Sequence, residues 1–191
     1  MNNLIFFLRD RFLEDFKGVT KPIDFMEVEF AVAVSKTYPN AKKKSYKIPN
    51  NVSKYVGKDR QWFTDVERLY CPYMIHGHWI GLCIDLSSHE ITVLQPDPTK
   101  YAFNELTKEL QPLAESLPFV ITKCATNSEM DADMTKPFTI TSYAGEWKIK
   151  RKGSHGITAM LLFELHASTT LNFLPNLDEA SVIDVGKNYG V

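Results

Sequence analysis

His78-Trp79-Ile80-Gly81-Leu82-Cys83-Ile84-Asp85-Leu86 lies near the middle of the 191-residue chain and carries its clearest structural signal. Most of these residues are apolar, and the length of the run is typical of a buried β-strand. A short polar connection, residues 87–90, separates it from a second strand-like run, Ile91-Thr92-Val93-Leu94. Two such runs joined by a short connection predict an antiparallel hairpin. Pro96 and Pro98 end the hairpin, because proline cannot continue a central ladder.

Segments on both sides of this hairpin predict a mixture of strands and helices. Strand-like runs cover residues 66–73, 120–124 and 138–140, and helical patterns cover residues 2–16, 25–34, 101–117, 156–167 and 179–185. Residues 37–60 contain prolines, a glycine and a lysine run, which is typical of a loop-rich connection. The order of elements predicts an α+β fold with a central, mainly antiparallel sheet flanked by helices.

The bulk composition indicates one folded domain spanning residues 1–191. Apolar residues make up 44% of the chain and charged residues 24%, and the formal net charge is −1. A nearly neutral chain gives no global electrostatic reason to bind nucleic acid or a membrane. We read the basic run at residues 148–152 as a solvated loop, with an acidic partner or nucleic acid as the alternative.

The cysteines and the start of the chain bear on the compartment. Cys71, Cys83 and Cys124 are scattered without metal-ligand spacing, and we interpret them as small buried side chains with reduced thiols. The opening residues have no basic segment before their short apolar run, so we expect a helix there and not a signal peptide. These features favour a nuclear or cytoplasmic protein.

Three motifs, in this order, resemble the ubiquitin-like-protein (SUMO-type, ULP) protease family. The first is Trp62-Phe63-Thr64-Asp65-Val66-Glu67-Arg68-Leu69-Tyr70-Cys71-Pro72, which is similar to the family's W-x-D-V-D-x-x-Y-x-P strand. The second is the central hairpin, where the family has H-W-…-I-D-L-…-I-x-V-x-D. The third is Gly153-Ser154-His155-Gly156-Ile157, where the family has G-x-D-C-G-V before an apolar helix. The opening helix also resembles that of plant, often transposon-associated, members.

This resemblance implies a papain-like cysteine-proteinase fold and a role for each matching position. His78 matches the general base, and Trp79 matches the aromatic residue that covers the Gly-Gly tail of a bound ubiquitin-like protein. Gln95 stands where the orienting acid is expected, and Asp97 is a possible substitute two residues later. His155 occupies the position of the nucleophilic cysteine, at the start of the apolar helix.

The chemistry at three of these positions departs from a working thiol protease. An imidazole at residue 155 has no thiolate reactivity, and Gln95 can orient a histidine but supplies no negative charge. Residues 147–152 contain no glutamine to serve as the family's oxyanion donor, and loss of one such donor typically costs ~10²–10³ in rate. We therefore expect a catalytically inactive domain, a pseudoprotease, that binds a SUMO-type ubiquitin-like protein or another protein.

Several alternatives stay open from the sequence. The domain could be an active deSUMOylating hydrolase with an unusual site, or a transposon-derived domain adapted to a regulatory or defence role. His76, His78 and His155, with an oxygen from Gln95 or Asp97, could also hold a zinc ion. The favoured interpretation needs neither a metal nor a cofactor.

Overall fold

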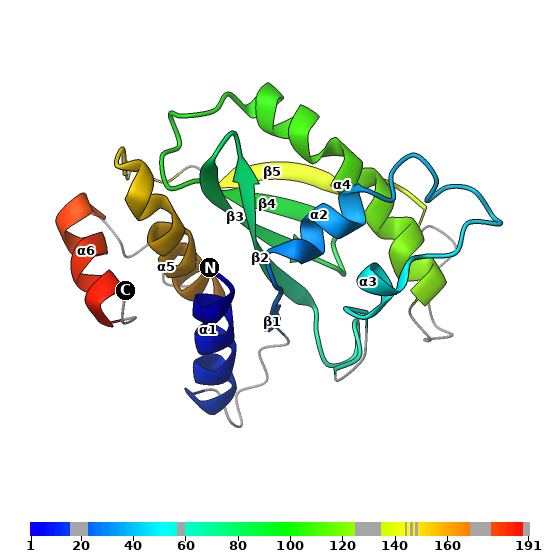
Figure 1. The fold of residues 1–191 in the computed structure, drawn as a ribbon, viewed down its shortest axis with the longest axis horizontal. Helices are drawn as coiled ribbons and strands as arrows, with labels where there is room; N and C mark the ends of the chain where they lie inside the picture. The colour runs from blue at the N-terminus through cyan, green and yellow to red at the C-terminus, as the bar shows by residue number, and fades with distance from the viewer. Residues whose placement is uncertain are drawn as a thin grey trace.

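The protein is described here by a computed structural model covering residues 1–15, 23–56, 60–124, 135–143, 145, 147, 149–168 and 177–188. Its centre is one five-stranded sheet with strands in sequence order, as Figure 1 shows. The strands are β1 (Ile23–Phe25), β2 (Arg68–Ile75), β3 (His78–Asp85), β4 (Glu90–Leu94) and β5 (Thr139–Tyr143). The two central pairings are antiparallel and the two outer pairings are parallel. The predicted α+β class is confirmed.

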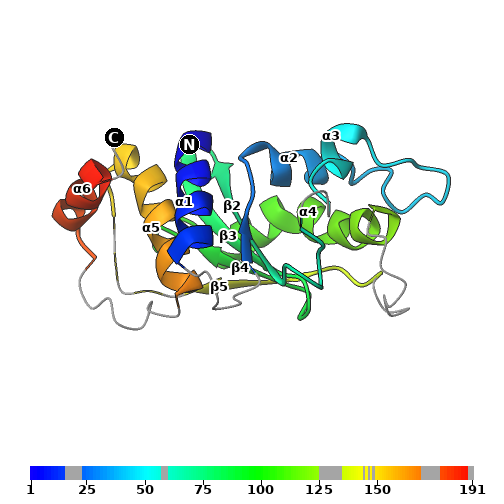
Figure 2. The ribbon, with the colours of Figure 1, turned by 90° about the horizontal axis from the view of Figure 1, so that it is seen from below.

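Helices gather toward the two ends of the molecule and enclose separate cores (Figures 1 and 2). The helices are α1 (Asn2–Asp15), α2 (Glu29–Ser35), α3 (Asn50–Ser53), α4 (Phe103–Cys124), α5 (His155–Ala167) and α6 (Glu179–Asn188). One core joins α2, α3 and α4 to one face of the sheet. The other joins α1, α5 and α6 to the opposite face, with Tyr70 and Phe163 fully buried in it. Burial of apolar surface on both faces is the main stabilising term.

Two stretches fold differently from the sequence-based expectation. Residues 120–124, predicted as a strand, form the last turns of α4, where Val120 and Ile121 extend the buried stripe of Leu113 and Leu117. A short apolar run fits a strand or a buried helix turn equally well, and tertiary packing decided for the helix. The helix expected over residues 25–34 begins only at Glu29, because Ile23–Phe25 pairs with β2.

A tight turn sets the position of His78. Ile75 and His78 are paired across the hairpin, so only His76 and Gly77 connect β2 to β3. Both have positive φ, 47° and 77°, as a type I′ turn requires. Glycine adopts this conformation without strain, whereas it costs a histidine about 1–2 kcal/mol. Within the described residues, no helix is long and apolar enough to cross a membrane.

Candidate functional site

The structure brings two histidines into contact where β3 and α5 begin. His78 is the first residue of β3, and His155 is the first residue of α5. Their Nδ1 atoms are 3.1 Å apart and their ring centroids 5.1 Å apart, although 77 positions separate them in sequence. The strand start and the helix start thus converge on one point.

The second hydrogen bond of His155 determines which histidine donates and which accepts in this contact. His155 is 3% exposed, and its Nε2 lies 2.6 Å from the carbonyl oxygen of Ile149. A carbonyl oxygen can only accept, so Nε2 of His155 carries a proton. In the neutral ring Nδ1 is then an acceptor, and Nδ1 of His78 must donate to it.

Gln95 directly follows β4. Leu94, the last residue of that strand, pairs with Gly81, three residues after His78 in β3. Gln95 is 3% exposed, and its Oε1 atom has no hydrogen-bond partner among the described residues. Leaving a buried polar atom unpaired costs about 1–3 kcal/mol. The side chain at the expected acid position is therefore buried and neutral, and its acceptor atom is unused.

Asp97, the possible substitute acid, belongs to a turn. Its Oδ1 accepts hydrogen bonds from the backbone N–H of Thr99 at 3.0 Å and from the Thr99 hydroxyl at 2.6 Å. Burial acts to raise the pKa of Asp97, but the Thr99 hydrogen bonds and the charges of His155 and Lys150 outweigh it and lower the pKa. Asp97 therefore lies close enough to influence the histidine pair electrostatically, while its hydrogen bonds hold the turn.

Trp79 packs beside the start of α5. A Cβ atom placed on Gly156 would lie 3.4 Å from Cδ1 of Trp79 and 2.9 Å from the terminal methyl carbon of Met1. Glycine at 156 thus lets both side chains approach the helix next to His155. The indole is half-buried, so part of its surface remains available to a ligand.

The segment before His155 directs a backbone carbonyl at the His155 ring. Trp147 Nε1 donates to the Gln95 carbonyl at 2.8 Å, and the N–H of Ile149 donates to the Pro96 carbonyl at 3.1 Å. These bonds hold the segment against the end of β4 and direct the Ile149 carbonyl at His155. A carbonyl oxygen repels a developing negative charge, in contrast to the N–H groups of an oxyanion hole.

The three cysteines do not supply a replacement thiol. Cys71 and Cys83 lie in central strands, and burial raises the pKa of both thiols, that of Cys83 to about 12. Burial also raises the pKa of the half-buried Cys124 at the end of α4. A thiol with a raised pKa carries little nucleophilic thiolate at neutral pH.

The zinc alternative finds no support. Among the described residues, no group of three or more His, Cys, Asp or Glu side chains is placed to hold a metal ion. The exposed His76 packs near Tyr101, with ring centroids 6.1 Å apart, and the Tyr101 ring is also 6.2 Å from that of His78.

Sequence reasoning missed three contributors to this site: Tyr101, Met1 and the Ile149 carbonyl. Tyr101 donates a hydrogen bond to the Ile75 carbonyl at 2.9 Å and so fixes its ring beside the hairpin turn. No motif contains Tyr101 or Met1. The Ile149 carbonyl is a backbone group, which leaves no signal in residue identity.

The fold of this chain is similar to that of several solved structures. The C-terminal Ulp1 protease domain in complex with Smt3, the yeast ortholog of SUMO, aligns with a TM-score of 0.63 at 12% identity, over 96% of this chain and 70% of that one. ChlaDub1 from Chlamydia trachomatis aligns with a TM-score of 0.54 at 13% identity, over 100% and 88%. The C. trachomatis effector Cdu1 bound to ubiquitin gives 0.52 at 14% identity, over 100% and 90%. A search of curated proteins found no match.

These alignments, with a histidine at a strand start facing the first residue of a buried helix, define the chain as a domain with the Ulp1-like cysteine-protease fold. A second comparison is more specific. The model of the Ulp1 protease family, C-terminal catalytic domain, matches residues 1–190, and the chain belongs to this family.

Proposed function

We propose that this domain is a catalytically inactive member of the Ulp1 family that binds a ubiquitin-like protein. The observation that carries the proposal is the hydrogen-bond chain from His78 through His155 to the Ile149 carbonyl. In a thiol protease the base needs a thiol to deprotonate, and here its Nδ1 is engaged by a second imidazole. Gln95 is neutral where a thiol protease has an acid, and the Ile149 carbonyl that faces His155 cannot donate a hydrogen bond to an oxyanion.

The binding half of the proposal rests on Trp79. Its indole lies beside the relic nucleophile position and is half-buried, so a narrow peptide tail could pack on its exposed part. A rigid aromatic side chain buries a large area with little loss of conformational entropy. Relatives with this fold bind Smt3 and ubiquitin, which supports a ubiquitin-like partner.

Calorimetric titration with SUMO and with ubiquitin tests the binding. Trp79→Ala should weaken binding of the preferred protein by about 1–2 kcal/mol, roughly five- to thirtyfold. Phe103→Ala is the control, because Phe103 is 52% exposed on α4 and lies in neither core. Absence of binding to either protein would remove the proposal and favour a transposon-derived domain with an unrelated regulatory or defence partner.

A fluorogenic substrate with a SUMO tail tests the inactivity. We expect no cleavage by the wild-type domain. Cleavage that disappears in both His78→Ala and His155→Ala would overturn the proposal and establish a hydrolase with an unusual site.

A further inference from the structure

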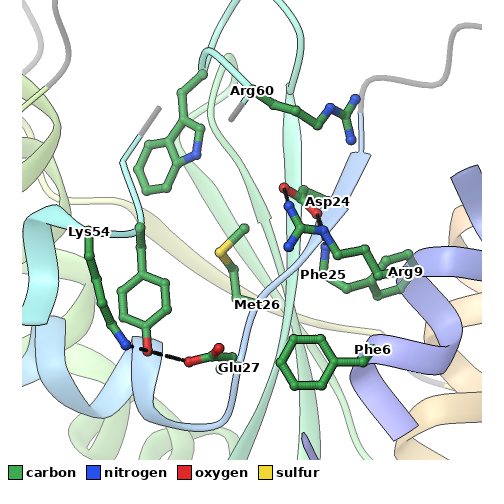
Figure 3. Close-up of a pocket in the computed structure, with 10 residues that line it drawn as sticks. Phe6, Arg9, Asp24, Phe25, Met26, Glu27, Lys54 and Arg60 are labelled. Atoms are coloured by element: carbon green, nitrogen blue, oxygen red, sulfur yellow. Dashed lines mark hydrogen bonds and ion pairs between the residues drawn. The ribbon is translucent and has the colours of Figure 1, made fainter. Parts of the chain in front are cut away.

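A pocket of about 190 Å³ opens between α1, β1 and the segment that follows α3 (Figure 3). Phe6 and Arg9 come from α1 and Asp24 from β1, and Tyr55 and Arg60 belong to the segment that follows α3. Neither His78, His155 nor Trp79 contributes to its lining. The pocket is thus separate from the histidine site.

Asp24 anchors a guanidinium group inside this pocket. Its side chain is 5% exposed, and its two oxygens face Nε and Nη2 of Arg9 at 2.9 and 3.2 Å. The backbone N–H of Phe25 donates to Oδ1 at 2.8 Å. Burial raises the pKa of Asp24, although Arg9, the Phe25 N–H and Arg60 all act to lower it. Both oxygens are occupied, so Asp24 holds Arg9 in place and offers little to a cation from outside.

Arg60 is held by neutral groups. Its Nη1 donates to the Ile23 carbonyl at 2.6 Å, and its Nη2 donates to the Asp65 carbonyl at 2.7 Å. Each guanidinium has five N–H donors, and the described hydrogen bonds use Nε and Nη2 of Arg9 and the two Nη atoms of Arg60. N–H donors on both groups therefore remain for a ligand, and a carboxylate is a preferred acceptor for a guanidinium.

The charge balance of the lining also favours an anion. Three cations, Arg9, Lys54 and Arg60, face two carboxylates. Glu27 is engaged within the protein, because its Oε2 accepts the Tyr55 hydroxyl at 2.8 Å and lies 3.7 Å from Lys54 Nζ. The carboxylates are thus already paired, and one positive charge is left over.

Apolar side chains also line the pocket. Phe6 of α1 is 44% exposed, and Met26 and Trp62 are buried. A ligand with only a carboxylate would leave the apolar side chains exposed to water. A ligand with only an apolar group would cover the remaining N–H donors of Arg9 and Arg60 without accepting a hydrogen bond from them. The fitting ligand combines both, with the carboxylate within a few ångströms of an apolar group.

We propose that this pocket binds a partner-protein segment in which an acidic residue adjoins an aromatic or branched aliphatic residue. The carboxylate takes the free donors of Arg9 and Arg60, and the apolar side chain covers Phe6. This assignment does not depend on a ubiquitin-like tail at Trp79, so either proposal can fail alone.

NMR titration of the ¹⁵N-labelled domain with a blocked Glu-Phe dipeptide tests the pocket. We expect saturable shifts of the Phe6, Met26 and Arg60 amides, at least tenfold weaker for blocked Lys-Phe and for blocked Glu-Ala. Equal affinity for Glu-Phe and Lys-Phe would overturn the charge argument. Tighter binding of 3-phenylpropionate than of Glu-Phe would overturn the assignment to a protein segment in favour of a small carboxylate.

A matched pair of variants separates the pocket from the rest of α1. Phe6→Ala should weaken Glu-Phe binding at least fivefold, whereas Phe7→Ala should leave it unchanged, because Phe7 is equally exposed, at 44%, and does not line the pocket. Arg60→Gln should weaken binding further, and unchanged melting temperatures would show that the fold persists. Equal effects of Phe6→Ala and Phe7→Ala, or no saturable shifts in the wild type, would overturn the proposal. Trp79→Ala should have no effect here.

Discussion

Replacing His155 with cysteine should destabilise the domain without making it a protease. The imidazole of His155 serves two groups at once: it donates to the Ile149 carbonyl and accepts from His78. A cysteine side chain is too short to reach both. Ile149 is fully buried, so its carbonyl would lose its donor with no water to replace it.

The expected loss of unfolding free energy follows from these contacts. The unpaired carbonyl costs about 1–3 kcal/mol. The lost ring atoms leave a cavity on the order of 50 Å³, which adds about 1 kcal/mol if the site does not relax. We expect His155→Cys to be less stable than the wild type by about 2–4 kcal/mol in urea unfolding, with an unchanged m-value.

His155→Gln is the matched variant for this measurement. Its amide N–H can donate to the Ile149 carbonyl and its amide oxygen can accept from His78, which preserves both directions of the hydrogen-bond chain. We expect it to lose less than His155→Cys. A cysteine variant as stable as the wild type, together with a less stable glutamine variant, would refute the hydrogen-bond reasoning.

The same cysteine variant is also informative about activity. Gln95 remains neutral in it, and no glutamine is added before residue 155 to serve as an oxyanion donor. Turnover of the fluorogenic SUMO-tail substrate should stay at background, because the new thiol supplies only one of the three catalytic groups that a thiol protease needs here. Clear turnover by His155→Cys would refute the argument that the acid and the oxyanion donor are also missing.

Three further predictions concern the scaffold of the site. Gly81→Ala should destabilise the fold by about 1–3 kcal/mol in urea unfolding, because the new Cβ would lie 2.5 Å from Cε1 of the buried Phe163; no loss would show that this ring can move. His166 has its Nδ1 2.7 Å from the Tyr70 hydroxyl, and burial lowers the pKa of its imidazole. Since the unfolded chain then binds a proton more readily than the folded one, the free energy of unfolding should fall as the pH drops through about 6.5. His166→Gln should flatten this fall, by at most about 1.4 kcal/mol per pH unit, and an unchanged pH profile would contradict it. His76→Asn should raise the melting temperature, because asparagine adopts positive φ more readily in a type I′ turn; a lower value would contradict the strain argument.

The local pattern of the sequence was enough to place the central hairpin and the buried helix. The alternation after His78 and the all-round apolar character of residues 156–167 are strong signals, because each depends only on near neighbours. The boundaries at His78 and His155 are confirmed by the structure. The pattern could not place residues 23–25 in the sheet or residues 120–124 in α4, because short apolar runs satisfy either geometry until their tertiary partners are known.

At the site, residue identity alone predicts that thiol, acid and oxyanion glutamine are absent from the positions the family motifs indicate, because chemistry at one position does not depend on packing. Only the tertiary structure decided what the residues at these positions contact. The contact between His78 and His155, the unpartnered Oε1 of Gln95 and the Ile149 carbonyl that faces His155 arise between segments far apart in the chain. The same holds for the pocket that joins Phe6 and Arg9 to Arg60. Hydrogen-bond direction and pocket shape depend on distances that folding sets, and no local pattern in the sequence encodes them.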